Sequence, residues 1–362
     1  MLRQGPQKSH QRRGFALLTV VLILTFGLAL FLGRYPRPYW TPPRLLWEDP
    51  LARRLILNLR LPRVLAACLL GMVLSVAGAV MQMLFRNPLV EPGFLGVSQG
   101  AAFGAALGII VIGASPLVLQ GTAVLFALLG LGLSYSLARH IRFGGWTLRL
   151  ILAGIAVSAF FAAGVGLLKY VADPLTQLPE LVFWLLGALW GVTWTETLAI
   201  LPITVAALLV AYLMRWRLNL LSLDDRIAIS LGSAPVRERA LLLLFVVAAT
   251  AAVVSVSGIV SWVGLIVPHF ARRIFGADGQ RAIPGTLLLG GIFALVCDTI
   301  ARVAFVGEIP LGILTSLLGA GCFTVLMVVP RHPHAYLKLA PLRHRRASTA
   351  LEEVTAQEGK RV

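Results

Sequence analysis

Few residues in this chain have the types and spacing that catalysis or metal binding requires. Cys68, Cys297 and Cys322 stand singly inside apolar runs, whereas zinc, cluster and disulfide sites use cysteines paired at defined spacings. His269, which follows Pro268, has no other histidine, cysteine or carboxylate at ligand spacing, so we expect it to make a structural hydrogen bond. The sequence therefore predicts no catalytic residue, no metal site and no cofactor bound by this chain.

Nucleotide binding and ion-coupled transport also lack the residues that they need. The one Gly-Lys pair, Gly359-Lys360, has no glycine-rich loop before it, so no phosphate-binding loop is expected. Lys169, Glu196 and Asp298 lie among apolar residues but form no relay across a bilayer. Asp298 stands four residues before Arg302 and is expected to pair with it. An ion-coupled secondary transporter is therefore only the alternative class, and an intramembrane enzyme has little support.

The elements that must carry these residues are membrane-spanning helices. The chain has 362 residues, of which 58% are hydrophobic and only 13% charged. Charge-free runs such as residues 14–33 and 64–85 reach the roughly 20 residues that a spanning helix needs, and they lack the alternation of barrel strands. We expect an all-α polytopic protein with about ten transmembrane helices. Its predicted parts are an N-terminal tail (1–13), a transmembrane domain (14–330) and a C-terminal tail (331–362).

The distribution of basic residues predicts the orientation of the chain in its membrane. If both termini are cytoplasmic, most lysines and arginines fall in the tails and loops on the cytoplasmic side, as expected for membrane proteins. The net charge of +17 is thus explained by membrane lipid and orientation, with no nucleic-acid partner. A cluster of arginines between Arg34 and Arg63 is the exception, because it falls in a loop on the opposite side.

The loop at residues 86–93, on the predicted cytoplasmic side, is unusually rich in turn-forming residues. Two prolines fix its backbone, while Asn87 and Glu91 can bond free amides. A stiff turn is one interpretation. The other is a constriction where the chain leaves its helices and lines a pore.

The segment at residues 214–239 joins two predicted spans on the same side and is longer than most helix connections. Within it, residues 223–232 have the pattern of a short amphipathic helix that ends at Gly232. An exposed apolar face on such a helix indicates a docked cytoplasmic partner, whereas a solvated connector is the alternative.

Several motifs follow one another along most of the chain. They are Arg60-Leu61-Pro62-Arg63, Gly78 to Gln82, Arg86-Asn87-Pro88-Leu89, Pro92-Gly93-Phe94-Leu95-Gly96, Leu231-Gly232, Gly264-Leu265-Ile266-Val267-Pro268-His269 with Arg272, Asp298 with Arg302, and Ile309-Pro310-Leu311-Gly312. In order and spacing they resemble the FecCD family of ABC permeases, which serve uptake of iron-siderophores, haem and cobalamin, with relatives handling molybdate. The resemblance implies the type II ABC importer permease fold, in which Pro268, His269, Arg272 and Asp298 belong to structural motifs.

The resemblance also implies partners and roles for particular residues. Family members pair two permease copies, or a copy and a close homologue, with two cytoplasmic ATPase subunits that bind ATP and with an external substrate-binding protein. By position, the cytoplasmic gate would contain Asn87, Pro88 and Leu89. The coupling helix on the ATPase would contain Asp225, Ala228, Leu231 and Gly232. The docking site for the binding protein would contain Arg60, Arg63 and Arg302.

The cargo is the least determined expectation. An iron chelate, either ferric siderophore or haem, is the commonest cargo of the family, and cobalamin or molybdate is the alternative. Val260-Ser261-Trp262 departs from the smaller Gly- and Phe-containing pattern of many relatives, and Gly321-Cys322 stands where Pro-Phe is common. These departures weaken any inference about cargo from the resemblance.

Overall fold

A computed structural model describes residues 6–34, 39–113, 115–304 and 307–328. The chain divides into two units, residues 1–320 and 321–362. Of the second unit, residues 321–328 are described, and they form the last part of helix α15. The predicted C-terminal tail (331–362) lies outside the described residues.

The described residues are overwhelmingly helical. The longer helices are α1 (Pro6–Phe31), α4 (Leu61–Leu84), α5 (Val97–Leu107), α6 (Pro116–His140), α7 (Trp146–Val171), α8 (Gln177–Leu186), α9 (Trp194–Leu213), α12 (Pro235–Ser257), α13 (Val263–Phe275), α14 (Gly279–Val303) and α15 (Leu311–Val328). The shorter elements are β1 (Leu32–Gly33), β2 (Tyr39–Trp40), α2 (Leu45–Glu48), α3 (Pro50–Arg54), η1 (Leu55–Arg60), η2 (Pro92–Leu95), η3 (Gly108–Ile112), α10 (Arg217–Leu221) and α11 (Asp225–Ser230).

The predicted all-α membrane fold is confirmed. Among the described residues, eight helices are long and apolar enough to cross a membrane. The other two predicted spans correspond to shorter helices, α5 with η3 and α13. At about 1.5 Å per residue, the 13 residues of α13 extend only about 20 Å, less than the roughly 30 Å of hydrocarbon. A further short apolar helix, α8, was not predicted, and α1 already begins at Pro6, within the predicted tail.

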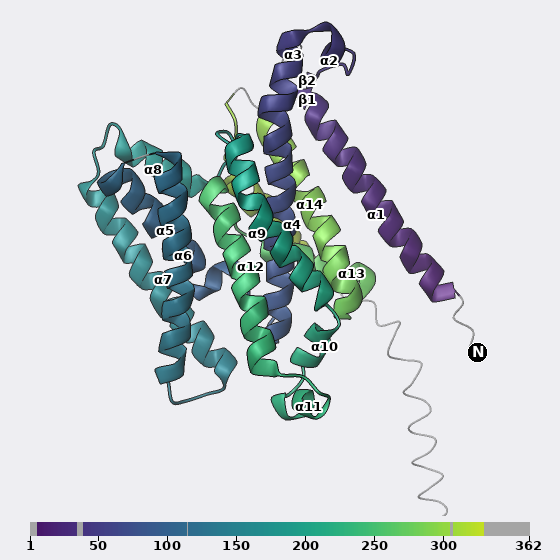
Figure 1. Cartoon of the computed structure of the whole chain (residues 1–362), viewed down its shortest axis with the longest axis vertical. Coiled ribbons are helices and arrows are strands. Elements are labelled where there is room, and N and C mark those ends of the chain that lie inside the picture. Colours follow the sequence, from purple (N-terminus) through teal and green to yellow (C-terminus); the bar gives the residue numbers. More distant parts are fainter. Residues whose placement is uncertain (1–5, 35–38, 114, 305–306, 329–362) are drawn as a thin grey trace, which may run out of the picture. The chain divides into compact units, whose positions relative to one another are not determined.

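Helix α4 is the central element, and α9, α12, α13 and α14 pack around it (Figure 1). Glycines permit the closest approaches. A Cβ atom on Gly78 would lie 1.9 Å from the carbonyl oxygen of Gly264 in α13, and one on Gly71 would lie 2.1 Å from that of Gly290 in α14. Small residues at such crossings let helix backbones meet, which stabilises helix pairs where no hydrophobic effect drives them together.

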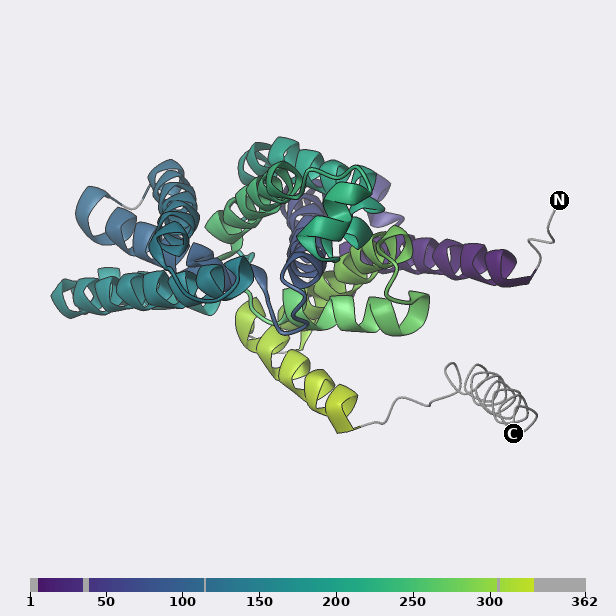
Figure 2. The same cartoon turned by 90° about the horizontal axis from the view of Figure 1, so that it is seen from below.

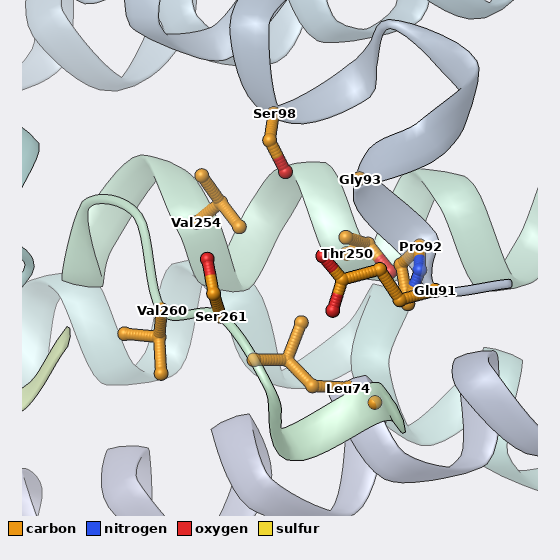
Figure 3. A pocket seen from close by; sticks show the side chains of 10 residues that line it. Leu74, Glu91, Pro92, Gly93, Ser98, Thr250, Val254, Val260 and Ser261 are labelled. Carbon is orange, nitrogen blue, oxygen red and sulfur yellow. The ribbon is translucent and has the colours of Figure 1, made fainter. Parts of the chain in front are cut away.

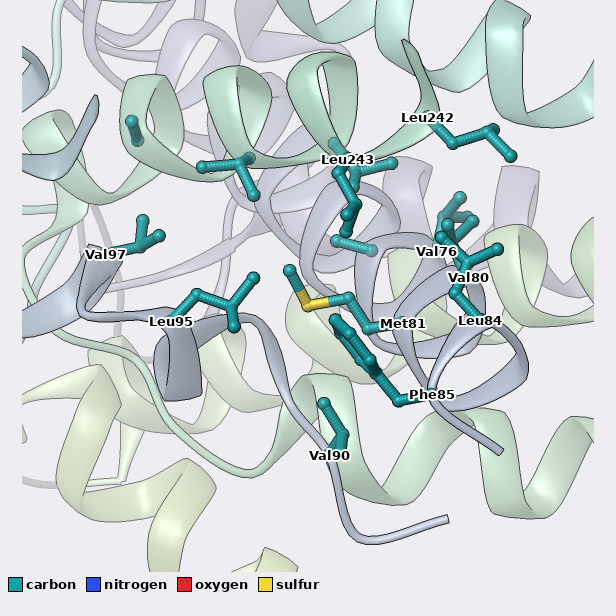
Figure 4. Close-up of a cluster of buried hydrophobic side chains, with 14 of the residues drawn as sticks. Val76, Val80, Met81, Leu84, Phe85, Val90, Leu95, Val97, Leu242 and Leu243 are labelled. Atoms are coloured by element: carbon teal, nitrogen blue, oxygen red, sulfur yellow. The ribbon is translucent and has the colours of Figure 1, made fainter. Parts of the chain in front are cut away.

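Helices α5, α6 and α7 pack against one another and lie together beside α12 in both views (Figure 1, Figure 2). A continuous apolar core joins this group to α4. In it, Met81 and Phe85 from α4 and its C-terminal end meet Val90 and Leu95 from the chain that follows (Figure 4). The chain between α4 and α5 is therefore fixed in place by buried side chains at both of its ends.

The two ends of this helical unit differ in character (Figure 1). Helices α10 and α11 lie at one end, which we call the α11 end. At the opposite end, the α3 end, α3 and η1 continue α4 backward, so that residues 50–84 form one apolar helical segment. The same end carries the antiparallel ribbon of β1 and β2, in which Leu32 pairs with Trp40.

Candidate functional site

The predicted gate residues lie in the loop between α4 and η2 (residues 86–91), at the α11 end. The side chain of Asn87 accepts a hydrogen bond from the backbone amide of Leu89 at 3.0 Å, which closes a tight turn as expected. Pro88 and Leu89 are exposed at the tip of this turn, whereas Val90 is buried. The α4–η2 loop is thus a rigid turn that presents an apolar tip.

The α4–η2 loop is tied to α13 through His269. The Nε2 atom of His269 lies 3.1 Å from the carbonyl oxygen of Pro88. That oxygen can only accept, so Nε2 carries the proton in this contact. The prediction that His269 makes a structural hydrogen bond is confirmed. Among the described residues, no group of three or more histidine, cysteine, aspartate or glutamate side chains is placed to hold a metal ion.

Glu91 ends the loop and faces inward. Its carboxylate accepts a hydrogen bond from the backbone amide of Trp262, which precedes α13. Burial raises the pKa of Glu91, and the bond from Trp262 opposes that shift. The expectation that Asn87 and Glu91 bond free amides is therefore confirmed for both residues.

The predicted amphipathic helix is present as α11. Asp224 caps its start by accepting from the amide of Arg226 at 3.0 Å, and Gly232 ends it with a left-handed backbone (φ +79°). Ala228 is fully buried beneath the helix, while the side chain of Asp225 is bonded to Arg239 of α12 at 2.7 Å. These two predicted coupling residues therefore hold α11 onto α12.

Apolar side chains on either side of the buried Ala228, and at the end of α11, are exposed. Ile227, Ile229 and Leu231 are 51%, 61% and 56% exposed, and we call these three side chains the α11 patch. Ile227 and Ile229 are exposed residues of the predicted coupling segment that were not among the predicted site residues. Their spacing along the amphipathic pattern was the available signal.

The α11 segment and the α4–η2 loop touch each other directly. Arg86, whose backbone is left-handed (φ +51°), donates a hydrogen bond from its guanidinium to the carbonyl oxygen of Leu223. Leu223 belongs to the connection between α10 and α11. The structure therefore brings the predicted gate and the predicted coupling helix into contact, although 137 positions separate Arg86 from Leu223.

At the α3 end, two of the three predicted docking arginines form a buried ion cluster. Arg63 lies 2.9 Å from Asp298 and 2.8 Å from Glu308, and Arg302 lies 3.0 Å from the same Asp298. We call these four residues the Asp298 cluster. Arg63 and Arg302 are only 9% and 8% exposed. The predicted Asp298–Arg302 pair is confirmed, whereas Arg63 and Glu308 are partners that no sequence spacing indicated.

The third predicted docking residue, Arg60, also points into the protein. It donates to the carbonyl oxygen of Leu30 at 3.1 Å and to the hydroxyl of Thr41 at 3.0 Å. Its guanidinium fills the space beside Gly33, where a Cβ atom would lie only 2.2 Å away. Arg60 therefore fastens the ribbon to η1. Among the described residues of this end, the exposed arginines are Arg34, Arg44, Arg53 and Arg54.

Comparisons with known proteins agree with this architecture. The model of the FecCD transport family matches residues 21–329. The molybdate import system permease protein MolB of Haemophilus influenzae is 37% identical over 86% of this chain and 94% of its own. A protein of Helicobacter pylori described as a probable iron chelatin transport system permease is 40% identical over 75% of this chain and 82% of its own.

A solved structure has the same fold. It is an inward-facing chain assigned to a metal-chelate type ABC transporter, and it superposes with a TM-score of 0.81 at 36% identity, covering 87% of this chain and 99% of its own. The chain therefore belongs to the FecCD transport family and is a multi-pass membrane permease of an ABC importer.

Proposed function

We propose that this permease imports an iron chelate, a ferric siderophore or haem, across the bacterial inner membrane, with both termini in the cytoplasm. The observation that carries the mechanism is the contact between Arg86 and the carbonyl oxygen of Leu223, because it joins the loop at the pathway to the segment that faces the ATPase. In this proposal the α11 end is cytoplasmic and the α3 end is external.

The α11 patch supports an ATPase partner. Three exposed apolar side chains in and directly after a six-residue helix are costly to leave in solvent, and a docked protein would cover them. The helix beneath the patch is fixed by Ala228 and by the Asp225–Arg239 bond, so a force on it reaches α12. We propose that ATP binds only on the two partner subunits and that α11 is their contact.

A second permease copy would complete the pathway. Helix α7 exposes a series of large apolar side chains, including Phe160, Leu167 and Tyr170. One chain alone cannot enclose a channel for a bulky chelate, and a second copy related by twofold symmetry would face this one across a shared axis. The tips of two α4–η2 loops, with Asn87, Pro88 and Leu89, would then close that axis at the cytoplasmic side.

The external binding protein would dock at the α3 end. Arg53 and Arg54 are exposed there, next to Arg60 and the Asp298 cluster. Acidic residues on a partner would complement this surface and speed its association. In this proposal Arg60, Arg63 and Arg302 lie beneath the docking surface and stabilise it. When Glu308 moves away from Arg63, the guanidinium of Arg63 becomes accessible to the binding protein.

The cargo assignment is tested by uptake of four radiolabelled compounds into cells with and without this gene: ferric siderophore, haem, cobalamin and molybdate. Each uptake is repeated after the Walker lysine of the partner ATPase is replaced. We expect that uptake of one iron chelate is lost both without this gene and after inactivation of the ATPase. The similarity to MolB makes molybdate the second candidate, and loss of molybdate uptake alone would replace the iron assignment. Uptake that needs this chain but survives ATPase inactivation would overturn ATP coupling in favour of an ion-driven carrier.

A further inference from the structure

Helix α13 is bounded at both ends by residues with left-handed backbone. Its N-terminal cap, Trp262, has φ +73°, and its C-terminal cap, Gly276, has φ +88°. A left-handed tryptophan is a rare conformation that persists only where the surrounding structure holds it. These two joints separate α13 from α12 and α14, so α13 is a short rigid segment between two turns.

Gln82 fastens α13 to the C-terminal part of α4. Its Nε2 atom donates to the carbonyl oxygens of Gly264 at 3.2 Å and Leu265 at 3.4 Å, and its Oε1 atom accepts from Arg272 at 2.6 Å. One turn before Gln82, the Gly78 contact lets the two backbones meet. One buried amide side chain thus bonds to both the first turn and the last turn of α13.

The α4–η2 loop adds two further ties to the same helix. His269 donates to the carbonyl oxygen of Pro88, and the carboxylate of Glu91 accepts from the amide of Trp262. The predicted gate tip, at Leu89, lies between these two ties. It cannot shift by itself without breaking hydrogen bonds to α13.

The chain around Gly258 is tightly fixed, whereas the linker between Gly258 and Trp262 borders a small cavity. The carbonyl oxygen of Ser257 accepts from the amide of Ala188 at 2.7 Å, and a Cβ atom on Gly258 would lie 2.1 Å from a neighbouring backbone oxygen. The linker after Gly258, in contrast, borders a cavity of about 20 Å³, lined also by Glu91 and Thr250 (Figure 3). That volume is about the size of one water molecule.

The α10–α11 segment contacts this arrangement at two points. Arg86 bonds to the carbonyl oxygen of Leu223, and the side chain of Asn219 bonds both to Asp278 at 2.7 Å and to the amide of Gly279 at 2.8 Å. Asp278 caps α14 directly after the Gly276 joint. A displacement of α11 therefore reaches the loop at one side and the second joint of α13 at the other.

We propose that α13 and the α4–η2 loop move as one body that turns at Trp262 and Gly276, and that Gln82, His269 and Arg272 are its positioning residues. The inference rests on the proposed importer function, because it assigns the moving body of its cytoplasmic gate. In this arrangement ATP-driven movement of α11 rotates α13, and the gate tip follows because it is bonded to α13.

The test uses Leu89→Cys as a reporter, in the full-length chain that also carries Cys68→Ala, Cys297→Ala and Cys322→Ala. Maleimide labelling of this cysteine is followed in membranes that contain the whole transporter, with and without ATP. Breaking one tie by His269→Ala should raise the ATP-free labelling rate about fivefold, since one hydrogen bond of ordinary net strength is lost. Gln82→Ala, which breaks ties at both ends of α13, should raise it further.

Three comparisons separate positioning from general damage. His269→Gln keeps a donor within reach of Pro88 and should restore slow labelling. His140→Ala is the matched control, because the hydrogen bond of His140 stays within its own helix, with the carbonyl oxygen of Ser136. The third readout is cargo moved per ATP hydrolysed, which should fall in His269→Ala and Gln82→Ala while ATP hydrolysis continues.

The inference would be overturned if the unaltered protein transports its cargo but neither His269→Ala nor Gln82→Ala changes the labelling rate at position 89 or the cargo moved per ATP. Labelling that rises equally in His140→Ala would also overturn it. Failure of the unaltered protein to import any of the four cargoes would instead count against the proposed function. The two failures are thus distinguishable.

Discussion

The guanidinium of Arg63 lies 2.9 Å from the carboxylate of Asp298, although 235 positions separate the two residues. Arg302 holds the other oxygen of the same carboxylate and also donates to the carbonyl oxygen of Ala29 at 2.9 Å. One buried aspartate therefore connects α1, α4 and α14 at the α3 end.

Asp298→Ala should destabilise the protein by about 3–5 kcal/mol, because it leaves the buried guanidinium of Arg302 without its carboxylate partner and leaves Arg63 with Glu308 alone. The thermal unfolding midpoint of the purified transporter reports the loss. Glu48→Gln, which removes the exposed partner of Arg44 at 4.0 Å, is the control and should stay within about 0.5 kcal/mol of the original. Equal midpoints for the two variants would contradict a structural role for the Asp298 cluster.

The docking surface gives a second prediction. Arg53→Glu with Arg54→Glu should weaken capture of the binding protein by at least tenfold in a surface-binding assay while the unfolding midpoint stays unchanged, because both side chains are exposed. Arg63→Glu should weaken capture and lower the midpoint together, since Arg63 is buried against Asp298. Normal capture by the double variant would move the docking site away from α3.

The α11 patch gives a third prediction. Ile229→Asp should release the ATPase subunits from detergent-solubilised complexes without unfolding the permease, because the side chain is 61% exposed and would place a charge in an apolar contact. Leu175→Asp, at another highly exposed leucine between α7 and α8, is the matched control. Co-purification of the ATPase with Ile229→Asp at the original ratio would refute the α11 patch as its contact.

The crossing of α4 and α13 gives a fourth prediction. Gly78→Ala should cost about 1–3 kcal/mol, because the added methyl group would overlap the backbone of Gly264. Gly121→Ala, where a Cβ atom meets nothing within 4 Å, should be neutral or slightly stabilising. The thermal unfolding midpoints of the two variants, measured under the same conditions, test this difference. A neutral Gly78→Ala would show that the two helices separate easily.

A fifth prediction concerns pH. Burial raises the pKa of Glu91 above its ordinary 4.5, so its stabilising contribution is complete below 4.5 and is lost as the pH rises through the raised value. The thermal unfolding midpoint of the original protein should therefore fall relative to that of Glu91→Gln as the pH rises.

Asp173 should behave in the opposite way. Hydrogen bonds from the amide of Leu175 and the hydroxyl of Thr176 lower the pKa of Asp173 below its ordinary 3.8. Its contribution is present above 3.8 and is lost as the pH falls through the lowered value. Asp173→Asn should thus differ from the original protein at neutral pH and converge with it in acid. If the unfolding midpoints of both variants, relative to the original protein, changed in the same direction as the pH rises, these two pKa assignments would be contradicted.

Much of the fold and part of the site follow from local sequence. Apolar length alone predicts the long spans, and a glycine with positive φ, Gly258, ends α12 before α13. The end of α11 at Gly232 and the turn at Asn87 were predictable because a backbone conformation or a local hydrogen bond fixes them within a few residues. Helix α8 was missed because it is only 10 residues long.

The residue pairings, in contrast, depend on the tertiary structure. The position of Asp298 beside Arg302 in the sequence predicted their bond, but nothing local connects Asp298 with Arg63, Pro88 with His269, or Arg86 with Leu223. These contacts form where helices far apart in the sequence cross, at positions set by glycine packing and by the bends around α13.

The sequence by itself thus determined that the chain is a polytopic α-helical membrane protein with particular loops, since hydrophobic length and turn chemistry are local properties. Only the packed helices decided which arginines are buried, and which helix is bonded to the loop with the predicted gate residues. A charged or polar side chain in a low-dielectric interior must find its partner there, and that partner is chosen by the geometry of the helix crossings.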